Sequence, residues 1–142
     1  MIKRSLMCIA ALTVWAAAFA DEVWSTVIGD VIYEADINEI AVLSYPLEGN
    51  EERGHVFISG LGGNYDDRGH FEGYWSEPSL GHSGCQMSIV DENGRTTDNW
   101  GRVTITFLES GFPSGWVAVR GKCFEEPKEH LVGNPIVAPG VR

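Results

Sequence analysis

The sequence is poor in basic side chains and in cysteine. Its 142 residues include 10 Lys and Arg against 20 Asp and Glu, which gives a formal net charge of −10, and 3 Cys. A chain this acidic is repelled by nucleic acids and by anionic membrane surfaces. We therefore expect no nucleic-acid partner, whereas a basic protein would be attracted by the charge.

Motifs typical of an enzyme or a metal site are also missing from the sequence. There is no Gly-x-Ser-x-Gly elbow, and the glycines near position 62 do not lie between a strand and a helix as a phosphate loop does. His55, His70 and His82 lack the paired spacing of zinc ligands. A hydrolase that uses His70 with Glu72 is the least favoured function, because no nucleophile lies beside them. We predict no catalytic residue, no cofactor and no metal ligand.

Residues 1–20 have the features of a secretory signal peptide. Two basic residues precede a short apolar run from Leu6 to Ala17, and Ala18 and Ala20 are the small residues that signal peptidase requires. The run is shorter than the ~20 residues of a membrane-spanning helix. We expect export to the periplasm or the medium, and a mature chain of 142 − 20 = 122 residues without a membrane span.

Two cysteines remain after this segment, Cys85 and Cys123. An even number in an exported chain favours a disulfide, because the compartment is oxidising. Closing a loop of this length restricts the unfolded chain by about 4 kcal/mol in the chain-entropy treatment. The sequence therefore predicts that this disulfide is a large part of the stability.

Short runs rich in Val, Ile, Thr and aromatic residues recur along the chain, separated by Gly, Pro, Asn and Asp. This pattern, with no long helical period, is typical of an all-β domain. We predict an antiparallel meander of seven or eight strands, closed as a small barrel, with a two-sheet sandwich as the alternative. The predicted domain covers residues 21–125. The proline-containing segment 126–142 is expected to be an extended or disordered tail.

The stretch from Trp100 to Cys123 organises this prediction, because it contains two strands and the turn between them. Apolar alternation predicts that Val103, Ile105 and Phe107 face the core, together with Val117 and Val119 of the second strand. Upstream, Asn93-Gly94 is a strong turn signal that should fold residues 85–91 back onto 95–100. Trp and Arg side chains left outside the core are typical of binding hot spots. The candidate binding residues are therefore Trp100, Arg102, Trp116 and Arg120, and we expect Trp116 and Arg120 to be partly exposed and close together.

In size, export signal, single disulfide and meander, the chain resembles small periplasmic barrels, including lysozyme inhibitors and lipocalin-like folds. The resemblance is one of architecture, and it implies no particular activity. Two functions remain open: an acidic binding or inhibitor module that engages a basic protein, and a carrier of a small apolar ligand. The carrier predicts an interior cavity of ~300 Å³ or more, lined by Phe71, Trp75 and Phe107.

Overall fold

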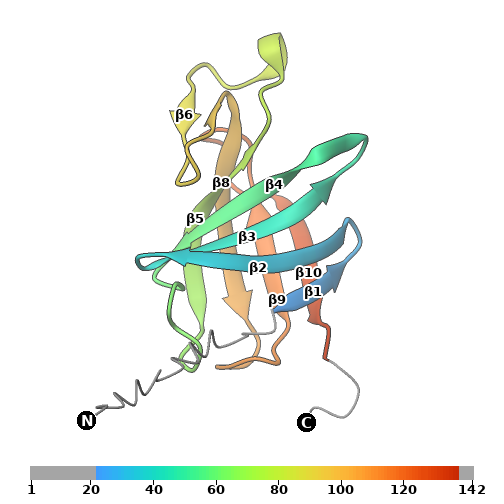
Figure 1. Ribbon diagram of the computed structural model, residues 1–142, viewed down its shortest axis with the longest axis vertical. Helices are drawn as coiled ribbons and strands as arrows, with labels where there is room; N and C mark the ends of the chain where they lie inside the picture. The colour runs from blue at the N-terminus through green and yellow to red at the C-terminus, as the bar shows by residue number, and fades with distance from the viewer. Residues whose placement is uncertain (1–21, 138–142) are drawn as a thin grey trace, which may run out of the picture.

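The computed structural model, which describes residues 22–137, is a closed antiparallel β-barrel (Figure 1). Strands that follow one another in the barrel are hydrogen-bonded neighbours, and the last barrel strand pairs with the first. This confirms the predicted barrel over the alternative sandwich. The predicted signal peptide lies outside the described residues. The barrel strands are β1 (Val23–Thr26), β2 (Gly29–Ile37), β3 (Ile40–Leu47), β4 (Asn50–Ser59), β5 (His70–Glu77), β8 (Asn99–Phe107), β9 (Trp116–Arg120) and β10 (Glu129–Pro135).

The up-and-down topology gives the barrel two ends. Loops 38–39, 60–69 and 108–115 lie at one end together with residues 22 and 137, and we call this the terminal end. Loops 27–28, 48–49, 78–98 and 121–128 lie at the other, which we call the disulfide end. In Figure 1 the terminal end is at the bottom.

The segment after Phe124 corrects the predicted domain boundary at residue 125. Instead of a tail, it supplies β10, which pairs with β9 from Glu129 to Gly133 and reaches β1 at Pro135. The strand was missed because its sequence, EHLVGNP, has few β-branched residues and ends in proline. Its backbone nevertheless closes the barrel, so the domain extends at least to residue 135.

The faces of β9 are the reverse of the prediction. Its register places Ala118 opposite Ile105 and Trp116 opposite Phe107, both of which face the core. Cross-strand partners share one face of a sheet, so Trp116 points inward and is only 2% exposed. Val117 and Val119 lie opposite Thr106 and Thr104 on the outer face, although their apolar character is typical of a core strand.

Large aromatic side chains fill the barrel at the terminal end. Trp24 is fully buried and meets Phe107, Phe112 and Trp116 edge-on, with ring centroids 5.9–6.4 Å apart. Its indole Nε1 donates to the Ser114 carbonyl at 2.7 Å. Such pairs add about 0.5–1.5 kcal/mol each beyond their buried area, so this layer is a major source of stability.

A buried arginine covers this aromatic layer. The side chain of Arg68 has no exposed surface and makes an ion pair with Glu22 at 2.7 Å. Its guanidinium lies 5.3 Å from the Phe107 ring and within 6 Å of the rings of Tyr33 and Tyr65. The charge is therefore held between one carboxylate and three aromatic faces, an arrangement that favours a cation in a dry site.

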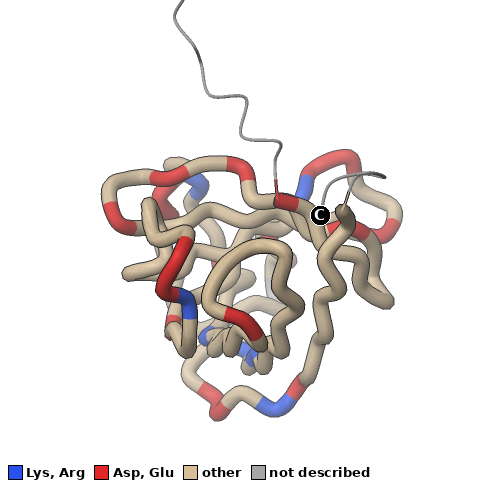
Figure 2. The backbone as a smooth tube through the Cα atoms, turned by 90° about the horizontal axis from the view of Figure 1, so that it is seen from below, with Lys and Arg blue, Asp and Glu red and all other residues tan. Residues whose placement is uncertain are grey.

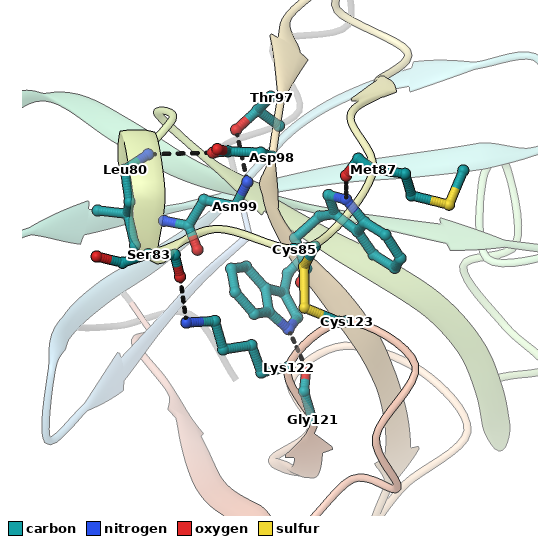
Figure 3. Close-up of a disulfide and its surroundings, with 12 residues drawn as sticks. Leu80, Ser83, Cys85, Met87, Thr97, Asp98, Asn99, Gly121, Lys122 and Cys123 are labelled. Atoms are coloured by element: carbon teal, nitrogen blue, oxygen red, sulfur yellow. Dashed lines mark hydrogen bonds between the residues drawn. A yellow bond between two sulfur atoms is a disulfide. The ribbon is translucent and has the colours of Figure 1, made fainter.

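The long connection 78–98 packs against the outside of the barrel at the disulfide end (Figure 3). It contains a short 3₁₀ turn, η1 (Gly81–Ser83), and the hairpin of β6 (Ile89–Val90) and β7 (Thr96–Thr97). The Asn93-Gly94 turn is confirmed, although the strand before it is much shorter than predicted. The Cys85–Cys123 disulfide, also confirmed, joins this connection to loop 121–128.

Candidate functional site

The half of the barrel nearest the disulfide end contains a cavity of about 150 Å³. It lies beyond the aromatic layer, with Trp116 among its walls. Most of the inward side chains that surround it are aliphatic, and the larger ones, Tyr45, Trp75 and Trp116, lie at its walls without filling it. The aliphatic lining consists of Val31, Leu43, Val56, Val103, Ile105, Ala118 and Leu131.

A polar cluster lies at the edge of this cavity. The Tyr45 hydroxyl donates to Glu77 Oε2 at 2.6 Å, and Arg120 Nη1 donates to the same oxygen at 3.0 Å. The Arg120 guanidinium also lies over the Trp75 ring, 4.7 Å from its centroid. Nε of Arg120 is 3.4 Å from Glu129, whose side chain is 72% exposed. The cavity therefore has an apolar body and a polar rim.

Tyr45 and Arg120 of the rim both have a pKa above the usual value, so both stay protonated to a higher pH. Burial, followed by the Glu77 carboxylate, raises the pKa of Tyr45, so its hydroxyl remains a donor. Burial lowers the pKa of Arg120, but Tyr45, Glu77 and Glu129 together raise it by more. The rim thus holds one positive charge between two carboxylates, which leaves a net negative charge.

The cavity opens sideways, between the β1–β2 turn and β10. Its lining includes Val27 and Ile28 on the turn, and Glu129, His130 and Leu131 on β10. Since neighbouring side chains of a strand point to opposite faces, a cavity that contacts both His130 and Leu131 reaches the edge of β10. Val27 is 95% exposed there, so the opening has an apolar lip.

The four candidate binding residues do not form one surface. Trp116 and Arg120 both line the cavity from inside, so the expectation that Trp116 is exposed is wrong. Trp100 is also buried, at 5% exposure, and lies on the outer side against Phe124 with a ring distance of 4.9 Å. Arg102 is exposed on the outside of β8. The four residues therefore form two separate pairs, with Trp116 and Arg120 lining the cavity and Trp100 and Arg102 on the outer face of β8.

Two residues of the polar rim, Tyr45 and Glu77, were missed in the sequence. A signal for Glu77 was present, because it continues the period-two series of Phe71, Gly73 and Trp75, which faces inward. Tyr45 lies in an almost wholly apolar run, IAVLSY. Such a run gives no alternation from which the inner face can be identified.

The cavity differs from the one expected for a carrier. It is half the expected volume, and of the three expected lining residues it includes Trp75 alone. Phe71 and Phe107 pack edge-on against each other, 6.2 Å apart, toward the filled end. The interior is therefore packed toward the terminal end and hollow toward the disulfide end.

Carboxylates dominate the outer surface of two hairpins. Glu34, Asp36 and Glu39 on the β2–β3 hairpin are exposed, as are Glu48, Glu51 and Glu52 on the β3–β4 hairpin, and positions 34–52 contain no Lys or Arg. Figure 2 shows acidic positions distributed around the barrel rather than gathered in one place. Within residues 22–137, no group of three or more His, Cys, Asp and Glu is placed to hold a metal ion.

Comparison with known proteins does not assign a function. No protein-family model matches the sequence, and neither the curated proteins nor the solved structures give a match. The part of the chain that the structure describes has no helix with the length and apolar character needed to cross a membrane. Function is therefore inferred from the cavity, its opening and the surrounding charge.

Proposed function

We propose that this chain is an exported binding protein that takes a small apolar group into its barrel. The observation that supports this most strongly is the apolar cavity of about 150 Å³ with an opening beside β10. Its walls are largely apolar side chains that are left in contact with water when the pocket has no occupant. An apolar occupant removes that surface from water, and a cavity of ~150 Å³ is enough for benzene.

The polar rim favours an uncharged or cationic ligand. Arg120 is already paired with Glu77 and lies near Glu129, so an anionic group entering the opening would meet an excess of carboxylate. A hydroxyl, carbonyl or amine could exchange hydrogen bonds with this cluster. The ligand class is therefore a small ring system, such as benzene or indole, or a short aliphatic chain, with at most one polar group.

Export is part of the proposal. The segment 1–20 has the composition of a signal peptide, and the Cys85–Cys123 disulfide suits an oxidising compartment. Cell fractionation with antibody detection would place the mature chain outside the cytoplasm. Mass spectrometry of that chain should find a start at residue 21 and no free thiol.

The cavity is tested by titrating the protein with indole and following calorimetric heat or amide chemical shifts. Ala118→Phe places a ring in the cavity, so indole binding should fall at least tenfold. Val119→Phe adds the same ring on the outer face of the same strand and serves as the matched control, with wild-type affinity expected. Equal affinities for all three proteins would contradict binding in the barrel.

A second candidate, binding of a basic protein, is favoured by the exposed carboxylates on the β2–β3 and β3–β4 hairpins. Opposite charge accelerates association and makes it sensitive to salt. A basic lysozyme is a suitable probe, measured in low salt and at ~0.15 M ionic strength. Replacing Glu48, Glu51 and Glu52 by Lys should abolish the interaction. If the affinity for lysozyme changes neither with salt nor with this replacement, the acidic hairpins are not the binding surface.

A further inference from the structure

β10 has an unpaired edge along most of its length. From Glu129 to Gly133 it pairs with β9, but its pairing with β1 is limited to Trp24↔Pro135 and Ser25↔Asn134. Within residues 22–137, no other strand covers that edge between Glu129 and Gly133. The barrel is thus closed by strand pairing near the terminal end. Near the disulfide end, β1 and β10 are not paired, and we call this gap beside residues 129–133 the seam.

The seam arises because β1 is short. After Thr26 the chain turns at Val27 and Ile28 and returns as β2, with Thr26 opposite Gly29. β1 therefore ends before it can pair with residues 129–133 of β10. An edge left this way presents backbone N–H and C=O groups, which are a template for another strand.

The open edge borders the apolar cavity. Val27 and Ile28 line the cavity on one side of the seam, and His130 and Leu131 line it on the other. A strand added along β10 would direct alternate side chains inward. One of those side chains would enter the cavity, while the intervening ones would face solvent beside Val132, which is itself 50% exposed.

The charge around the seam indicates which segment would fit. Asp30 and Glu129 lie beside the seam. The nearby Arg120 is already paired with Glu77 and Glu129, and the chain as a whole has a net charge of −10. A basic or neutral segment would thus be favoured over an acidic one. A second copy of this chain would bring another −10 of net charge and is disfavoured for the same reason.

We propose that the β10 edge binds an extended polypeptide segment, of basic or neutral charge, by addition of one antiparallel strand. The segment lies beside residues 129–133 of β10, where β1 would lie if it continued past Thr26, and it inserts one apolar side chain into the cavity. This inference rests on the proposed function of the cavity. The apolar group that enters the cavity is then a side chain of a partner protein. The acidic surface attracts the same partner.

The probe is the peptide acetyl-Lys-Thr-Lys-Leu-Lys-Thr-Lys-amide, which has Leu and Thr on one face of a strand and Lys on the other. Two further peptides carry N-methyl groups on alternate amides, one on the odd positions and one on the even positions. In a strand, alternate residues direct their backbone groups to opposite edges. Strand addition along β10 uses one edge, so one methylated peptide should lose at least tenfold in affinity and the other should keep it.

Control peptides and variants separate the side chain from the backbone. Replacing the central Leu by Gly should weaken binding at least tenfold, and Ala118→Phe should weaken binding of the Leu peptide similarly. Asp30→Asn with Glu129→Gln should lower affinity a few-fold at low salt. Val119→Phe, on the outer face of β9, should bind as the wild type does.

The outcomes distinguish this inference from the function on which it rests. If indole binds but the peptide does not, or if both methylated peptides bind equally well, strand addition is wrong and the cavity remains a small-molecule site. If neither indole nor peptide binds, both are wrong. If light scattering shows a dimer that the peptide does not dissociate, the edge belongs to a second copy and the inference is overturned.

Discussion

The two halves of the barrel interior are built from the same strands but differ in how they are filled. At the terminal end, Trp24, Phe107 and Trp116 meet across the barrel and leave no room. Four residues away on β8 and two residues away on β9, Val103 and Ala118 line the cavity instead. Side-chain packing therefore divides the barrel interior into a packed half and a half that contains the cavity.

The two inward-facing arginines show the same division. Arg68 is wholly buried over aromatic rings and pairs with Glu22. Arg120 also lies over an aromatic ring and pairs with Glu77, but its side chain is 34% exposed at the cavity opening. The first arginine closes the packed half, and the second leaves hydrogen-bonding groups within reach of a ligand.

The largest effect is expected from truncation in the packed half. Trp24→Ala removes the ring at the centre of the aromatic layer and should lower the free energy of unfolding by about 3–5 kcal/mol. Val103→Ala in the cavity wall removes two methyl groups and should cost about 1–2 kcal/mol. Urea unfolding measures both, and a loss for Trp24→Ala no larger than that for Val103→Ala would contradict the tight packing of the aromatic layer.

The second prediction concerns the disulfide, at the end of the barrel that contains the cavity. Cys85 and Cys123 are separated by 38 positions, and replacing both by Ser should lower the free energy of unfolding by about 2–4 kcal/mol. The nearby contacts of Trp100 and Trp75 should loosen, because Trp75 Nε1 donates to the Gly121 carbonyl in the tethered loop. A shift of the indole NMR signal of Trp24, with the signals of Trp75 and Trp100 unchanged, would contradict this prediction.

Removing the carboxylate that pairs with Arg68 should cost more stability than removing one that pairs with Arg120. Glu22→Gln leaves the Arg68 charge buried without a counterion and should cost about 1–3 kcal/mol, reduced from the fully buried case because Glu22 is 16% exposed. Glu129→Gln removes a longer, exposed contact to Arg120 and should change stability by less than about 0.5 kcal/mol. Thermal unfolding of the two variants compares them, and a reversed order would contradict the description of the two ends.

Alkaline pH should give the most gradual change. Burial raises the pKa of both Tyr33 and Tyr45, and the carboxylates of Asp36 and Glu77 raise them further. Stability is then fully present below the unfolded value of about 10 and is lost as the pH rises above it, because the unfolded chain ionises first. Tyr45→Phe should reduce this loss. Absorbance near 295 nm that shows both tyrosines ionising in the folded protein near pH 10 would disprove the shift.

Much of the fold follows from local patterns in the sequence. The all-β class, the barrel, the disulfide and the inward face of β8 were predicted, because each depends on alternation, turn residues or cysteine number. The face of β9 was not, since two valines made its outer side look like a core. Only the register with β8 decides that face.

β10 and the cavity could not be read from local patterns. Gly133 of β10 is required by a distant residue: a Cβ atom there would lie 2.3 Å from the Trp116 ring. In the sequence this glycine looks like a turn signal. The cavity depends on small side chains facing one another across several strands, and no single strand reveals that coincidence.

The division of the interior is tested most directly by diffraction from crystals pressurised with xenon, which enters dry apolar cavities. We expect one xenon site inside the barrel, bounded by Val103, Ala118 and Leu131, and none within the aromatic layer around Trp24. An interior without xenon, or a xenon atom between Trp24 and Phe107, would contradict the division into a packed half and a half with a cavity.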